Sequence, residues 1–183
     1  MASANSEKAQ KLKRACDEAY AKYGSSCSHA VWSVISQYDP SQQYRQANQL
    51  IDYLETSPKW QPIAVNQLSG LASQGILVVG GLKKPSGNGH IVVVYPGPEM
   101  PNGGYYTTRS SGKIQKVSST GSYATVMSTS MGHWPGAKSH GDKTAWDPWG
   151  NDADFKKVRF WKYLGVGDKE KPVGALAAGV KQQ

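Results

Sequence analysis

The chain has 183 residues, with 21 lysines and arginines against 13 acidic residues and a formal net charge of +8. A chain of this length usually forms one domain with its own hydrophobic core. Its 38% hydrophobic content argues against a disordered chain, and two cysteines are too few for a disulfide framework or a four-thiolate zinc site. We therefore expect one domain over residues 1–183, in which residues 168–183 form a flexible tail.

The positive charge is explained either by a solubilising surface or by an anionic partner, and its distribution argues against nucleic acid. The basic residues are scattered along the chain, and no helix-turn-helix pattern accompanies them. No apolar run approaches the ~20 residues that a membrane-spanning helix needs, so we expect no membrane insertion. The polar start, residues 1–8, lacks the apolar segment of a secretory signal, so action outside the cytosol would need another export route.

The first third of the chain is predicted to be helical. Apolar residues recur at helical spacing over residues 7–23, 27–38 and 46–54. Pro40 ends the second of these helices, because the residue before a proline avoids the helical conformation. Residues 57–62 contain two prolines, and we expect an irregular connector there.

The remainder of the chain is predicted to be mainly β-structure. Two short β-branched apolar runs bounded by glycines are typical of buried strands, and several Gly/Ser/Thr-rich segments are typical of hairpins. The expected strands and hairpin segments are residues 75–80, 90–95, 104–109, 114–117, 123–130 and 157–163. Helices followed by strands indicate an α+β fold with the N-terminal helices packed on an antiparallel sheet.

Cys27 and His90 stand where a cysteine nucleophile and its base would be needed. Cys27 opens the second predicted helix, and the partial positive charge of a helix start stabilises a thiolate. His90 opens a strand after the flexible Gly87-Asn88-Gly89, which would set its imidazole at a sheet edge facing a cleft. A thiol paired with an imidazole is the arrangement used for nucleophilic attack on amides. Either residue alone is more commonly structural.

Two further residues bear on this pair. Cys16 lies inside the first predicted helix beside apolar positions, so we predict that it is a core residue. His29 follows Cys27 by two positions, about 200° around the helix, which makes it a poor base for that thiol.

An ordered set of segments resembles the type VI secretion amidase effectors, which are NlpC-type papain-like cysteine peptidases that cut peptidoglycan. Cys27 and the residues after it resemble the nucleophile helix of that family, and Gly89-His90 with the following apolar run resembles its Gly-His block. The resemblance covers residues 10–100 well and residues 134–163 loosely. The segments that agree in order are residues 12–16, 25–31, 46–54, 72–83, 89–94 and 97–98.

The resemblance implies a fold, an activity and partners. It implies a papain-like catalytic domain in which the Cys27 thiolate attacks a stem peptide, His90 moves the proton, and the Cys27 N–H contributes to an oxyanion hole. The expected bond joins γ-D-glutamate to meso-diaminopimelate, and no cofactor or metal is expected. By the same resemblance the chain would be an antibacterial toxin, injected by a type VI secretion apparatus into a rival's periplasm and inhibited by a cognate periplasmic immunity protein.

The chain departs from the family pattern in three places. The small residue usually found two positions after the nucleophile is His29 here, which would reshape one wall of the cleft. The residue that orients the histidine is not assigned by the pattern, and the candidates are Ser128, Ser130 and His133 or a backbone carbonyl. The inserted segment Gly103–Gly121 is either a substrate loop or a longer hairpin.

Three other functions compete with this interpretation. His140 and Asp147, with Ala145 between them, resemble the zinc-binding segment of some D,D-carboxypeptidases, but no further histidine follows. A carboxylate-pair glycosidase is disfavoured because no acidic residue stands in an apolar run. A non-catalytic wall-binding module would use tryptophans for sugar stacking, and the candidates are Trp134, Trp146 and Trp149.

Overall fold

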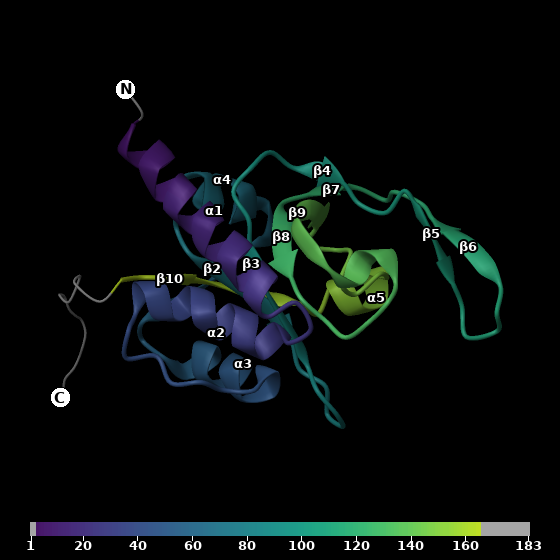
Figure 1. Cartoon of the computed structure of the whole chain (residues 1–183), viewed down its shortest axis with the longest axis horizontal. Helices are drawn as coiled ribbons and strands as arrows, with labels where there is room; N and C mark the ends of the chain where they lie inside the picture. The colour runs from purple at the N-terminus through teal and green to yellow at the C-terminus, as the bar shows by residue number, and fades with distance from the viewer. Residues whose placement is uncertain (1–2, 166–183) are drawn as a thin grey trace.

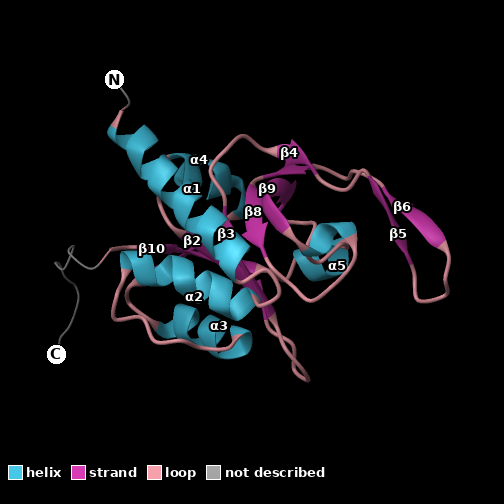
Figure 2. Ribbon diagram, viewed as in Figure 1, coloured by secondary structure: helices cyan, strands magenta, loops and turns pink. Residues whose placement is uncertain are grey.

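The computed structural model describes residues 3–165 and shows helices and an antiparallel sheet around one hydrophobic core (Figures 1 and 2). This confirms the α+β class expected from the order of helical and strand patterns. The predicted tail, residues 168–183, lies outside the described residues.

Serine side chains cap the starts of the first two helices. The Ser3 hydroxyl accepts the Ser6 N–H at 3.1 Å, which starts the first helix three residues before the apolar pattern does. Ser26 caps the second helix through the His29 N–H, and Asp39 ends it in front of Pro40. The helices are α1 (Ala4–Lys22), α2 (Cys27–Tyr38), α3 (Ala47–Thr56), α4 (Leu68–Ser73) and α5 (Asp152–Phe155).

A six-stranded antiparallel sheet forms the centre of the molecule. Its spatial order is β1-β10-β2-β3-β8-β9, so the C-terminal strand β10 pairs between β1 and β2. The strand that starts at His90 is central, and it pairs with β2 on one side and with β8 on the other. The strands are β1 (Trp60–Ile63), β2 (Val78–Leu82), β3 (His90–Val94), β8 (Thr125–Ser128), β9 (Ser139–Thr144) and β10 (Arg159–Tyr163).

The core lies between this sheet and the helices. Helices α1 to α4 all contact strands of the sheet, and α2 packs against α1 and β3. Because β3 is central and buried, its residues Ile91–Val94 read as a continuous apolar run and not as an alternating one. Cys16 is fully buried in this core, as predicted from its position in the first helix.

Two small ribbons leave the sheet between β3 and β8. The strands β4 (Met100–Pro101) and β7 (Ser122–Tyr123) pair at the base, and β5 (Tyr105–Thr108) and β6 (Ile114–Val117) pair further out. Figure 1 shows the β5–β6 hairpin standing away from the helices and the main sheet. The inserted segment Gly103–Gly121 is thus a long hairpin.

Several expected boundaries were wrong, each for a local reason. The predicted connector 57–62 contains most of β1, whose Pro62 is tolerated because β1 is an edge strand. The polar strand β9 was not predicted at all, since its sequence SHGDKT lacks apolar alternation. The expected segment 123–130 is divided between two sheets, with β7 in the ribbon and β8 in the main sheet.

Candidate functional site

Cys27 is the first residue of α2 and presents its thiol to the start of β3. The backbone N–H groups of Ile91, the residue after His90, of Ser28 and of Cys27 itself lie near the thiol and act to lower its pKa. Helix geometry leaves the first-turn N–H groups without an intrahelical acceptor, so they are free to face an anion. The prediction that Cys27 opens a helix is confirmed, and Cys27 and His90 line the same cavity.

His90 is the first residue of β3 and is held in place by the loop before it. The Asn48 side chain of α3 donates to the Lys84 carbonyl at 2.9 Å and accepts from the Lys84 N–H at 3.2 Å, which fastens that loop to the helix. Gly89 packs directly against the Asn48 side chain. A Cβ at position 89 would collide with the Asn48 amide and lie 2.7 Å from the Leu82 carbonyl oxygen. The glycine before the histidine is therefore required by close packing.

A hydrogen-bond chain fixes the far side of the His90 ring. The Nε2 atom lies 3.0 Å from the Ser128 Oγ, and the Ser128 hydroxyl donates to the Ala137 carbonyl, also at 3.0 Å. Because the single hydroxyl hydrogen of Ser128 is used on that carbonyl, Nε2 must carry the hydrogen in its own contact. In the neutral ring Nδ1 is then left with its lone pair, in the tautomer that a base needs.

Of the three candidate orienting residues, Ser128 is the one that the structure brings to His90. Ser130 lines the same cavity, and its hydroxyl accepts from the Gly132 N–H at 2.9 Å. His133 is exposed. The Ala137 carbonyl accepts from the Ser128 hydroxyl and so is linked to His90 through Ser128. It lies in a short 3-10 turn, Pro135–Ala137.

Burial raises the pKa of Cys27 and lowers that of His90, and both changes favour the neutral form of the group. Burial raises the pKa of the Cys27 thiol, although the Ile91, Ser28 and Cys27 N–H groups act in the opposite direction. Burial, assisted by the Lys84 cation, lowers the pKa of His90 to about 4. At neutral pH the resting pair is therefore a thiol beside a neutral imidazole, so the imidazole can accept a proton.

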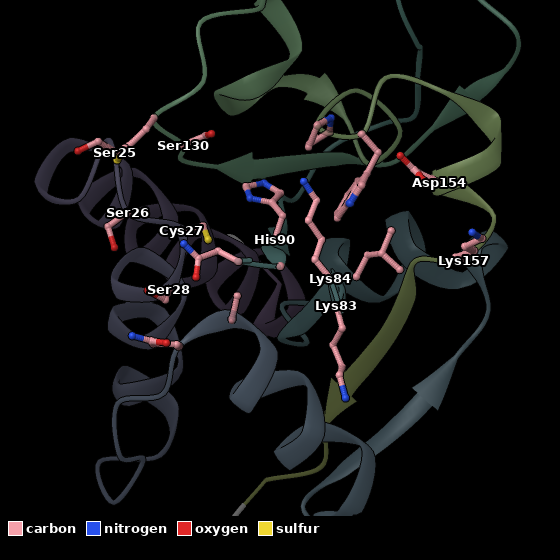
Figure 3. A pocket seen from close by; sticks show the side chains of 18 of the residues that line it. Ser25, Ser26, Cys27, Ser28, Lys83, Lys84, His90, Ser130, Asp154 and Lys157 are labelled. Carbon is pink, nitrogen blue, oxygen red and sulfur yellow. The ribbon is translucent and has the colours of Figure 1, made fainter. Parts of the chain in front are cut away.

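Cys27 and His90 lie at one end of a cavity of about 720 Å³ (Figure 3). Lys84 extends alongside His90, and Asp154 and Lys157 lie at the opposite end. The Trp149 ring packs edge-on against the His90 ring, with 5.4 Å between centroids. The cavity thus combines a thiol, an imidazole and charged groups of both signs, which suits a peptide-like substrate with ionised groups.

His29 takes no part in this pair, as the helical spacing predicts. Its Nδ1 lies 2.8 Å from the Ser26 Oγ, and its ring stacks on Tyr44 with 4.2 Å between centroids. The Tyr44 hydroxyl lies 2.7 Å from the Ser28 Oγ, and both residues line the cavity. His29 thus supports an aromatic wall of the cavity.

The residues of the zinc alternative serve other purposes in the structure. The buried Asp147 carboxylate accepts hydrogen bonds from the Gly103 N–H, the Tyr105 hydroxyl, and the N–H and hydroxyl of Thr144. The exposed His140 ring packs against Tyr20. Within residues 3–165 no three His, Cys, Asp or Glu side chains gather in a way that could hold a metal ion.

The three singled-out tryptophans divide between packing and the cavity. Trp146 is buried, and its Nε1 donates to the Asp152 carboxylate at 2.8 Å. Trp134 and Trp149 line the cavity, and Trp134 is 41% exposed. The sequence did not single out Lys84, Asn48 or the Ala137 carbonyl, because their contacts with the site join distant segments and follow no local pattern.

Comparison with known proteins adds no relative. No protein-family model matches the chain, and the search of curated proteins finds none that matches it. In the described part of the chain no helix is both long and apolar enough to cross a membrane.

Proposed function

We propose that this chain is a papain-like, NlpC-type cysteine amidase that cleaves the peptide stems of peptidoglycan. The observation that carries the proposal is the hydrogen-bond chain from Ala137 through Ser128 to His90, which supports the tautomer that a base beside Cys27 requires. The order of the sequence segments around Cys27 and His90 supports the choice of substrate.

The proposed reaction proceeds through a thioester. His90 Nδ1 takes the proton of the Cys27 thiol as the sulfur attacks the amide carbon, and first-turn N–H groups of α2 hold the oxygen that becomes negative. The imidazolium then protonates the leaving amine as the carbon–nitrogen bond breaks. Water next gives a proton to His90 and attacks the thioester, which releases the carboxylic acid product and restores the thiol.

The proposed substrate bond joins γ-D-glutamate to meso-diaminopimelate, and the proposed role is that of an antibacterial toxin. On this proposal a type VI secretion apparatus delivers the chain to a rival's periplasm, and an immunity protein protects the producer. The mixed charges of the cavity support a substrate that carries both carboxylates and an amine. Expression directed to the periplasm of a bacterium should cause lysis, while cytosolic expression should be tolerated. Equal toxicity in both compartments would contradict a wall substrate.

The decisive experiment is mass spectrometry of a purified soluble muropeptide after incubation with the protein. We expect cleavage at the γ-D-glutamyl bond, and a loss of at least about a thousandfold in rate for both Cys27→Ala and His90→Ala. Cys16→Ala is the matched control, because it removes a buried thiol that does not line the cavity, and it should retain turnover.

The same experiment separates the amidase from a wall-binding module. Turnover by Cys27→Ala would contradict the proposed mechanism. Binding of the muropeptide by the wild-type chain without any cleavage would instead favour a non-catalytic module that uses Trp134 and Trp149 in the cavity.

A further inference from the structure

The β5–β6 hairpin is an arm that takes no part in the candidate active site. Figure 1 shows it projecting from the side of the molecule, and no residue of the segment 103–121 lines the cavity that holds Cys27 and His90. We refer to residues 103–121 as the arm.

One face of the arm is exposed and carries apolar side chains. In the register of the hairpin Tyr106 lies opposite Lys116, and Ile114 lies opposite Thr108. Side chains of one strand alternate between the two faces, so these four share a face. Tyr106 is 64% exposed and Ile114 is 72% exposed. Two large apolar side chains at such exposure on one face of a ribbon are available for contact with a partner.

The base of the arm is held by buried polar groups. The fully buried Asn102 carboxamide accepts the N–H groups of Thr120 and Gly121 at 2.8 and 3.0 Å. The Asp147 carboxylate accepts the Gly103 N–H and the Tyr105 hydroxyl. Gly103 itself has φ +64°, and a Cβ there would lie 2.6 Å from the Val117 carbonyl oxygen. These contacts hold the hairpin in its outward direction, although the exposed face of the hairpin packs against no other part of the described chain.

The arm has a uniform positive charge. It carries Arg109, Lys113 and Lys116, all exposed, and the sequence has no aspartate or glutamate from residue 100 to residue 141. This excess disfavours pairing with the arm of a second copy, because the two arms would repel each other, and it favours an anionic occupant.

We propose that the arm binds the anionic polymer of the cell wall and holds the chain on it while the cavity engages a stem peptide. The inference rests on the proposed function. Two apolar side chains offer far less area for burial than the roughly 800 Å² that each partner buries in a stable protein interface. It suits a weak contact with a repeating polymer, since a tethered second contact raises overall affinity without being strong itself.

The test measures sedimentation of the full chain with purified peptidoglycan sacculi, in a Cys27→Ala background that prevents digestion. The arm variant replaces Arg109, Lys113 and Lys116 by glutamine, and a second variant is Tyr106→Ala. The control replaces Lys8, Lys13 and Arg14 of α1 by glutamine, which removes the same charge from exposed positions elsewhere. Cleavage of a soluble muropeptide is measured for the same substitutions with Cys27 intact.

We expect the arm triple variant to bind sacculi about tenfold more weakly at low salt, and this loss should shrink as salt is added. Tyr106→Ala should bind about fivefold more weakly, with little dependence on salt, because it removes no charge. The α1 control should bind as the unsubstituted chain does, and all variants should cleave the soluble muropeptide equally. Equal binding of sacculi by the arm variants and the control would overturn the inference. A dimer that the arm substitutions dissociate would also overturn it. Failure to cleave the soluble muropeptide would count against the proposed function, whereas the sedimentation result tests the arm.

Discussion

The candidate active site and the arm are positioned by different kinds of interaction. Cys27 and His90 begin elements whose next residues, such as Ala30, Val31 and Ile91, are buried in the core. The arm has almost no core of its own and depends on Asn102 and Asp147 at its base. The site should therefore tolerate only small changes in packing, while the arm should be sensitive to loss of a few hydrogen bonds.

The largest effect that would test this comparison is expected for Asn102→Ala. The substitution removes a buried carboxamide that accepts the Thr120 and Gly121 N–H groups, and the loss of these two hydrogen bonds should lower the free energy of unfolding by about 2 kcal/mol. Denaturant unfolding measures this loss, and hydrogen exchange at the two amides shows whether it arises at the base of the arm. Asn5→Ala, at an exposed position of α1, is the control and should have no measurable cost.

The candidate active site and the base of the arm should be independent of each other. Because the arm does not line the cavity, Asn102→Ala should leave the cleavage of a soluble muropeptide within about twofold of the unsubstituted rate. A fall in rate that parallels the fall in stability would show that the base of the arm also sets the geometry of the site.

A smaller effect, confined to the site, is expected for Ser128→Ala. Loss of the hydroxyl frees the His90 ring to rotate, so kcat should fall about ten- to a hundredfold while KM stays nearly constant. Ser130→Ala is the matched control, because Ser130 lines the cavity and its hydroxyl contacts Gly132. Equal losses from both substitutions would mean that Ser128 has no special role in orienting His90.

The smallest effect concerns pH and Lys84. Protonation of His90 removes the base, so kcat/KM should fall as pH drops through about 4. Lys84 helps to lower the pKa of His90, so Lys84→Gln should raise that pKa and move the acid limb to higher pH. Lys83→Gln is the control, since its ammonium pairs with Asp52, and it should leave the limb in place. An unchanged limb in Lys84→Gln would show that burial alone sets the pKa.

The sequence was sufficient for the elements that carry local patterns. Helical spacing placed Cys27 at a helix start, and the apolar run after His90 identified β3 as a buried strand. Glycine and proline marked the ends of these elements. Each of these features depends on residues close together in the chain, so periodicity could detect it.

The features that the sequence could not predict depend on contacts between distant segments. The polar strand β9 exists because β8 offers it a partner, not because of its own residues. The choice of Ser128 over Ser130 follows from which hydroxyl the His90 ring reaches, and that contact joins residues 38 positions apart in the chain. The arm's base acceptors, Asn102 and Asp147, lie 45 positions apart and show no common motif.

The close packing at Gly89 constrains how this sequence can change over time. A side chain at position 89 would displace the Asn48 amide, which holds the loop in front of His90. Replacement of Gly89 alone would therefore be selected against, and a lineage that lost it would have to change position 48 as well. Among descendants of this chain the two positions, 41 residues apart, should covary.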